Sequence, residues 1–283
     1  MGCKSTNLNE RPRFAFDTVT CTTPFLKKVK RLYKSKSFEL MEGNYKDILK
    51  TEDAVYAIEK IKPVQKYRRR RLYAKLVEAN INVVIPTHIE YIEMSDAILS
   101  VSSMDLFETD LFDYLANRTV DLKQFVSQIS RTVQSIHQVG IYCIDFKPEN
   151  ILLNSNMVFY IADLESALMK TDFVHPNILR RQRWVRTKGY DPGFGKPRNV
   201  EEAMRNDLYA MSLTIGRMEA YYTHKREYGV FTIPRCGMMP EGYDDRYRIP
   251  AEYKYSTFCA QFMVRDMMYT ELLKFYHSYL ISL

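Results

Sequence analysis

The spacing of apolar and polar residues predicts strands in the first part of the chain. Apolar and polar positions alternate in short runs that are bounded by polar turns, which is the pattern of half-buried strands. Two of these turns are residues 51–53, Thr-Glu-Asp, and residues 94–96, Met-Ser-Asp. The runs predicted as strands are 38–42, 46–50, 54–61, 88–93 and 97–101.

Helical spacing replaces this alternation further along the chain. Residues 122–138 place apolar side chains three and four positions apart, which predicts an amphipathic helix that Gly140 ends. His137 on this helix is expected to be structural, because no nucleophile pattern accompanies it. A hairpin is predicted from residues 151–153 and 157–162, so the helix and the hairpin bracket a polar stretch.

The bracketed stretch, I-Y-C-I-D-F-K-P-E-N, holds an acid, a lysine and an amide in a fixed frame: Asp145, Lys147 and Asn150. A second acid, Asp163, follows eighteen residues after the first. Phosphoryl transfer needs these residue types. One carboxylate orients the attacking hydroxyl, a second carboxylate and an amide hold Mg²⁺ on the phosphates, and a lysine neutralises charge in the transition state. A polar loop without chemistry is the alternative.

The frame D-x-K-P-E-N resembles the catalytic loop of eukaryotic-type protein kinases, which reads H-R-D-x-K-x-x-N. Cys143 and Ile144 stand where that family has His and Arg. The resemblance implies ATP and Mg²⁺ as cofactors and protein hydroxyls as phosphate acceptors. It also implies two sets of site residues: catalytic Asp145 and Lys147, and cofactor- and metal-binding Asn150 and Asp163.

The resemblance covers nearly the whole chain and implies an α+β, bilobal protein-kinase-like fold. Residues 38–104 would form an N-lobe with a small antiparallel β-sheet and one helix, and residues 105–283 a larger, mainly helical, trimmed C-lobe. Helices at 258–266 and 269–280 would close the C-lobe, and residues 1–37 would be a basic tail. This compactness and the eroded motifs are similar to those of kinases encoded by large DNA viruses.

The phosphate-binding residues of the N-lobe depart most from the family. The glycine-rich loop keeps Gly43, which allows one close backbone approach to phosphate. Glu59 replaces the lysine of the third strand. Three interpretations stay open. Lys46 supplies the charge, as in the with-no-lysine kinases; a β-bulge returns Lys60 to the inner face; or the site has lost its lysine and no longer catalyses.

A helix predicted at residues 65–79 corresponds to the one that supplies a glutamate to the strand lysine in the family. The aligned positions here, residues 68–71, are all arginine. Together with Glu59, this change predicts a reversed ion pair between the glutamate and one of the arginines. The alternative is that all four arginines form an exposed basic face of the helix. The three arginines that do not pair with Glu59 are expected to be exposed in either case.

Residues 163–192 resemble the activation segment of the family and are basic. Ile144 replaces the arginine that in the family binds a phosphate group on this segment. Activity is therefore predicted not to depend on phosphorylation of residues 163–192. Lys147 together with Thr187 favours serine or threonine as acceptor over tyrosine.

Asp207 opens a stretch that resembles the helix behind the catalytic loop in the family, where the acid caps the backbone of the loop. The alternative is that Asp207 is an ordinary helix N-cap.

Composition and charge narrow the class of protein. The chain has 283 residues, 46% hydrophobic and 27% charged, which suits a soluble globular protein with one large domain or two small lobes. Its net charge of +7 favours anionic partners. The five cysteines form no pair pattern, which indicates a reducing, cytoplasmic location. No apolar run approaches the length of a membrane span.

The N-terminus carries a possible membrane attachment. The first residues, M-G-C-K-S-T, fit an N-myristoylation pattern at Gly2, and Cys3 beside it is a candidate for palmitate. The basic run 27–36 would add attraction to an anionic membrane surface. A disordered tail with a chance glycine is the alternative.

Three functions follow from these observations. The first is a Ser/Thr protein kinase that transfers the γ-phosphate of ATP to protein substrates. The second is a catalytically impaired pseudokinase that acts as a membrane-associated binding module. The third, nucleic-acid binding, rests on net charge alone and is disfavoured, because the basic helix lacks the interleaved aromatic residues of a stacking surface.

Overall fold

The computed structural model contains helices and antiparallel sheets, an α+β composition. The residues that it describes are 16, 19–35, 38–42, 46–142, 144–174, 179 and 196–228. Several predictions fall outside these residues: those on Gly2, Cys3, Gly43, Thr187 and the helices at 258–266 and 269–280. The chain divides into two compact units, residues 1–74 with 84–106 and residues 75–83 with 107–283.

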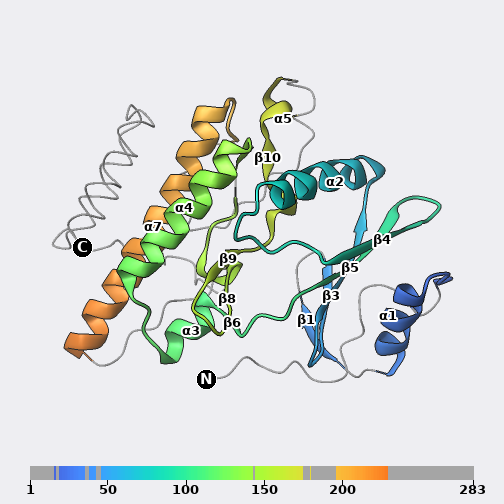
Figure 1. The fold of residues 1–283 in the computed structure, drawn as a ribbon, viewed down its shortest axis with the longest axis horizontal. Coiled ribbons are helices and arrows are strands. Elements are labelled where there is room, and N and C mark those ends of the chain that lie inside the picture. Colours follow the sequence, from blue (N-terminus) through green and yellow to red (C-terminus); the bar gives the residue numbers. More distant parts are fainter. Residues whose placement is uncertain are drawn as a thin grey trace, which may run out of the picture. The chain divides into compact units, whose positions relative to one another are not determined.

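The first unit contains a five-stranded antiparallel sheet in the order β1-β2-β3-β5-β4 (Figure 1). Its strands are β1 (Glu39–Glu42), β2 (Lys46–Lys50), β3 (Val55–Ile61), β4 (His88–Glu93) and β5 (Ile98–Met104). All five begin within one residue of the predicted positions. Only β5 runs on past Val101, because its last residues still pair with β3 and β4.

A helix that the sequence analysis missed, α1 (Pro24–Ser35), packs on one face of this sheet. Leu26, Val29 and Tyr33 lie at helical spacing and are buried. They join a core cluster with Phe16, Leu49, Tyr56, Ile58, Leu99 and Val101. The expectation of a tail outside the domain is therefore wrong for this segment, and the described part of the first unit has two helices rather than one.

Thr23 ties α1 to the edge strand β4. Its hydroxyl oxygen accepts a hydrogen bond from the Leu26 N–H at 3.2 Å, which caps the helix, and its hydroxyl donates to Glu90 at 2.7 Å. The basic side chains of the run 27–36 that are exposed on α1 are Lys27, Lys28, Arg31 and Lys34. The apolar face of the helix is thus used for packing on the sheet, and contact of its basic face with a membrane stays a prediction.

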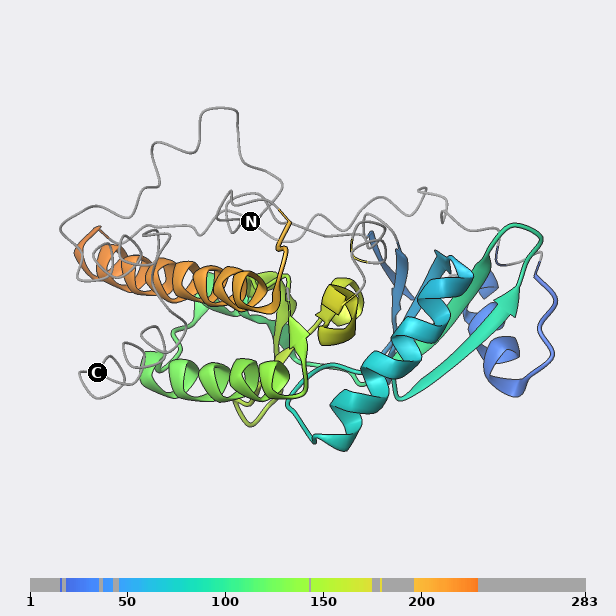
Figure 2. The ribbon, with the colours of Figure 1, turned by 90° about the horizontal axis from the view of Figure 1, so that it is seen from above.

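The second helix of this region, α2 (Pro63–Glu78), carries the arginine run. Proline suits its first position, because the missing N–H is not needed there. Leu72 and Leu76 are buried, whereas Val64 and Tyr67 are exposed. Helices α1 and α2 lie on opposite sides of the sheet (Figure 2), as the side-chain alternation along β3 requires.

The second unit contains two long helices that lie side by side, α4 (Leu122–Gln138) and α7 (Val200–Tyr228) (Figures 1 and 2). The predicted bounds of α4 are confirmed, and its apolar stripe is buried: Phe125, Val126, Ile129, Val133 and Ile136. The shorter elements are β6 (Thr109–Asp110), α3 (Leu111–Asn117), β7 (Ile141–Tyr142), β8 (Ile151–Leu153), β9 (Phe159–Ile161), β10 (Leu168–Met169) and α5 (Lys170–Val174). Strands β6, β8 and β9 form one sheet, and β10 pairs with β7.

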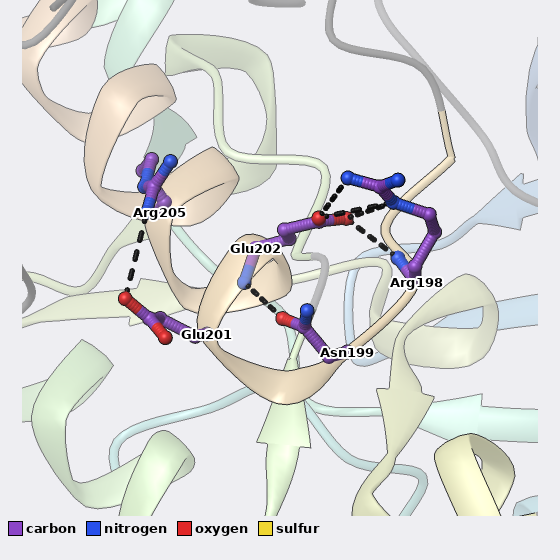
Figure 3. Close-up of polar contacts among 5 residues, drawn as sticks. All are labelled: Arg198, Asn199, Glu201, Glu202 and Arg205. Carbon is purple, nitrogen blue, oxygen red and sulfur yellow. Dashed lines mark hydrogen bonds and ion pairs between the residues drawn. The ribbon is translucent and has the colours of Figure 1, made fainter. Parts of the chain in front are cut away.

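Helix α7 begins earlier than the stretch predicted to open at Asp207. Asn199 caps it, since its side-chain oxygen accepts the Glu202 N–H at 2.8 Å (Figure 3). The Glu202 carboxylate accepts from the Arg198 guanidinium at 2.7 Å, and this hydrogen bond holds the pKa of Glu202 below its usual value. None of the described helices, α7 included, has both the length and the apolar composition needed to cross a membrane.

We expect Leu26→Ala to lower the free energy of unfolding by about 2–4 kcal/mol, because it leaves a cavity between α1 and the sheet. Urea unfolding followed by circular dichroism measures the loss. Lys27→Ala, at the exposed neighbouring position, is the control and should change it by less than about 0.5 kcal/mol. Equal unfolding midpoints for the two variants would contradict the packing of α1.

Candidate active site

Gly140 turns the chain from α4 into the candidate catalytic loop. Its φ is +76°, a left-handed conformation that residues with a Cβ rarely adopt. A Cβ at this position would lie 3.2 Å from the Cβ of Lys170. The Gly140 carbonyl accepts the Lys170 N–H at 2.8 Å, beside the pairing of β7 with β10. The turn therefore fixes where the loop begins.

Asp145, Lys147 and Asn150 meet in this loop. The Lys147 Nζ lies 2.9 Å from the Asp145 Oδ2, and the two side chains are 19% and 6% exposed. The Asn150 Nδ2 donates to the Asp145 carbonyl at 2.8 Å and to Oδ2 at 3.3 Å. Phe146, next to Asp145, is buried. One carboxylate oxygen is thus held by both a cation and an amide, and the loop is anchored in the core beside it.

Asn150 and Asp163 lie at the same end of the β8–β9 hairpin. Ile151 pairs with Ile161, and the Ala162 N–H donates to the Asn150 carbonyl at 2.8 Å. Asp163 follows directly in the left-handed region, at φ 59° and ψ 43°, which aspartate tolerates better than most residues with a Cβ. The hairpin therefore brings the two candidate metal ligands to one place.

The donor atoms at this end of the hairpin fit Mg²⁺. The Asn150 amide bonds two acceptor oxygens of Asp145, so its nitrogen faces Asp145. Its Oδ1 is the kind of neutral oxygen donor that can bind Mg²⁺. Asp163 adds a carboxylate, and Mg²⁺ is usually bound by one or two such groups together with phosphate and water. Within the described ranges, no three His, Cys, Asp or Glu side chains form a cluster that would hold a metal by themselves.

Asp207 of α7 joins the loop to α4. Its Oδ1 accepts the backbone N–H of Ile144 at 2.7 Å, and its Oδ2 lies 3.0 Å from the Nε2 of His137. The Asp207 and His137 side chains are each 2% exposed. These contacts confirm the predicted backbone cap and the structural role of His137. The alternative of a helix N-cap is wrong, because α7 begins at Val200.

In the first unit, the predicted reversed ion pair is present. The Arg69 Nη2 lies 2.7 Å from the Glu59 Oε2, and the side chains are 7% and 16% exposed. Arg70 and Arg71 are exposed and Arg68 is buried. The sequence offers four adjacent arginines, and only the rotation of α2 against the sheet decides that Arg69 meets β3.

Lys46 is the residue directly opposite Glu59 in the register of β2 and β3. Such residues have side chains on the same face, with Cβ atoms about 4.5–5.5 Å apart. The next residue, Asp47, faces α1, where the Tyr33 hydroxyl donates to its carboxylate at 3.5 Å. Lys46 therefore belongs to the face of Glu59 and Arg69, and its contact with phosphate stays a prediction.

Lys60 does not reach this face. Strands β3 and β5 pair without interruption from Val55 to Ile61, so no β-bulge turns Lys60 inward. Its ammonium lies 2.8 Å from Asp96, and its side chain is 44% exposed. The hydrogen bond and the charge of Lys60 hold the pKa of Asp96 below its usual value. The prediction of Lys60 as a cofactor-binding residue is corrected, because strand alternation decides its direction.

Comparison with known proteins gives a kinase relationship limited support. No family model matches the chain. The serine/threonine-protein kinase SKS1 of Saccharomyces cerevisiae is 29% identical to the chain over 91 residues, which are 30% of this chain and 18% of that protein. Because the match spans less than a fifth of the curated relative, it indicates a kinase-like relationship over part of the chain and no more.

We expect Asp207→Ala to lower the free energy of unfolding by about 3–5 kcal/mol, because it leaves the His137 ring and the Ile144 N–H without their buried partner. Asp207→Asn should cost less, since an amide oxygen still accepts the Ile144 N–H. Chemical denaturation measures both. Glu201→Ala removes an exposed acid from the same helix, and a loss no larger in Asp207→Ala than in this control would contradict the assignment.

Proposed function

We propose that this chain is a Ser/Thr protein kinase of the bilobal type, which transfers the γ-phosphate of ATP to hydroxyl groups of protein substrates. The observation that carries the proposal is the cluster of Asp145, Lys147 and Asn150, with Asp163 at the same end of the hairpin. The partial similarity to a yeast kinase supports the same class. The first unit would be the N-lobe and the second the C-lobe.

Asp145 would orient the attacking hydroxyl and accept its proton during transfer. Lys147 at 2.9 Å and Asn150 at 3.3 Å both bond its Oδ2, which keeps the carboxylate in one orientation. Proton transfer to a positioned group of this kind contributes about 10²–10⁴-fold in rate. Lys147 would also neutralise charge that develops on the transferred group.

The oxygen donors of Asn150 and Asp163 would hold Mg²⁺, which neutralises and aligns the phosphates of ATP when bound. Lys46 would supply the phosphate-binding cation in place of the strand lysine that Glu59 replaces. Its register opposite Glu59 supports this role, because it puts the ammonium on the face of the sheet that carries the family's lysine position. Gly43 would allow backbone approach to a phosphate.

A pseudokinase is the second candidate, and the outward direction of Lys60 favours it, because one of two replacement lysines is thereby removed. Such a protein would serve as a binding module rather than as a catalyst. Acylation of Gly2 and Cys3, together with the exposed cations of α1, would hold it at an anionic membrane surface.

We expect the wild-type protein to transfer labelled phosphate from ATP, with Mg²⁺ present, to a generic basic protein. Asp145→Ala should lower the rate by at least about 10²-fold, since it removes the positioned carboxylate. Lys46→Met should also lower transfer strongly at a limiting ATP concentration, whereas Lys60→Met should not. The two lysine variants are matched, because each removes one strand cation and only Lys46 lies on the face of Glu59.

Two results would contradict these assignments. Equal loss of transfer in Lys46→Met and Lys60→Met would contradict the choice of Lys46. No transfer by the wild-type protein, together with no thermal shift on addition of ATP and Mg²⁺, would make the pseudokinase the better interpretation. The Asp145 cluster would then be a structural feature of the loop.

We expect activity not to require phosphorylation of residues 163–192. Ile144 replaces the family's phosphate-gripping arginine, is 5% exposed, and has no charge with which to bind a phosphate. Protein treated with phosphatase should keep its transfer rate. A phosphosite found by mass spectrometry in this segment, whose removal abolishes transfer, would contradict the prediction.

A further inference from the structure

A row of side chains crosses the sheet on the face opposite α1. In the strand registers, Lys46 pairs with Glu59, Glu59 with Ser100, and Ser100 with Tyr91. The four residues come from β2, β3, β5 and β4, which are neighbours in that order. Arg69 of α2 joins the row through its ion pair with Glu59. The row therefore combines two cations and one carboxylate.

Glu59 lies between these two cations. Arg69 contacts it at 2.7 Å, and Lys46 is its partner across the β2–β3 ladder. Because Glu59 is only 16% exposed, its attraction to both cations is screened less than it would be in water. The three groups leave a net charge of +1. The carboxylate at the family's lysine position is therefore outweighed by the two cations beside it.

Helix α2 is held against the row at a second point, which keeps Arg69 in place. The Lys66 Nζ lies 5.3 Å from the centre of the Tyr91 ring, and the Arg70 guanidinium carbon lies 5.4 Å from it. Such cation–π contacts favour one approach of the helix to the sheet. Arg69 is 7% exposed, so its guanidinium has little freedom to leave Glu59. The Glu59 carboxylate is thus a fixed anion.

We propose that Glu59 is a positioning residue for Lys46: anchored by Arg69, its carboxylate holds the Lys46 ammonium in the direction that binds a nucleotide phosphate. This role rests on the proposed kinase function and deepens it. The sheet then supplies both the phosphate-binding cation and the acid that orients it, and α2 supplies a second cation that prevents the acid from repelling phosphate. A structural tie between β3 and α2, without effect on the nucleotide, is the competing explanation.

Glu59→Gln tests the role, because it removes the charge and keeps the shape. We expect the KM for ATP to rise about tenfold, the change that one weakened charge-assisted contact causes, with a smaller fall in kcat. Arg71→Ala removes an exposed cation from the same helix, one that does not belong to the row, and should leave the KM unchanged. A merely structural tie predicts lower stability without a selective rise in KM.

The charge swap Glu59→Lys with Arg69→Glu gives a sharper test. It keeps an ion pair between β3 and α2, reverses its polarity, and moves a lysine onto the strand. In the unswapped protein, Lys46→Met should raise the KM for ATP by at least about tenfold. In the swapped protein, the same substitution should have little effect, because the lysine introduced on β3 supplies the charge. A structural tie predicts an equal effect of Lys46→Met in both.

The outcomes separate this role from the proposed function. An unchanged KM in Glu59→Gln, or an equal effect of Lys46→Met in both backgrounds, overturns the role of Glu59 while the wild-type protein still transfers phosphate. A wild-type protein that neither transfers phosphate nor binds ATP overturns the proposed function, and the role of Glu59 with it. If the swapped protein does not fold, the comparison of Glu59→Gln with Arg71→Ala decides alone.

Discussion

One buried carboxylate, that of Asp207, fixes the geometry of the candidate catalytic loop. It accepts a backbone N–H from Ile144 and bonds the His137 ring, so α7, α4 and the loop share a single anchor. Removing a charge from water costs several kcal/mol, and the group is stable in the interior only because both of its oxygens have partners. The direction of Asp145 one residue later therefore depends on how two helices pack, and not on the loop alone.

In the first unit, too, a largely buried carboxylate joins two elements, here through an ion pair. The Glu59 carboxylate and the Arg69 guanidinium form a pair that is nearly removed from solvent and joins α2 to β3. Either residue alone would be an uncompensated buried charge, which costs about 3–5 kcal/mol when one partner of such a pair is lost. The two departures from the kinase pattern are therefore a single change in physical terms: the polarity of one ion pair is reversed.

The sequence predicted the elements whose side-chain period is unambiguous. The five strands of the first unit, the β8–β9 hairpin and α4 were predicted nearly to the residue, since alternation and helical spacing depend only on which face is buried. The two-residue strands β6, β7 and β10 were not predicted. Helix α1 was not predicted, because its lysines were interpreted as part of a basic tail. Leu26, Val29 and Tyr33 nevertheless have the helical spacing that indicates it. The partners of Glu59 and Asp207 could be identified only from the structure. The rotation of α2 about its axis decides which of the four arginines meets Glu59, and the sequence does not determine that rotation.

Ile144, at the family's arginine position, has a different physical basis from Glu59, at the family's lysine position. An arginine at this buried position would need an anion beside it, such as a phosphate on the segment that follows Asp163. Isoleucine needs none: its side chain is 5% exposed and its backbone N–H is already satisfied by Asp207. The loop is thus stabilised by apolar burial and one permanent acid. Two contacts that hold Asp145 come from Lys147 and Asn150 of the loop itself, and neither residue belongs to the segment that follows Asp163.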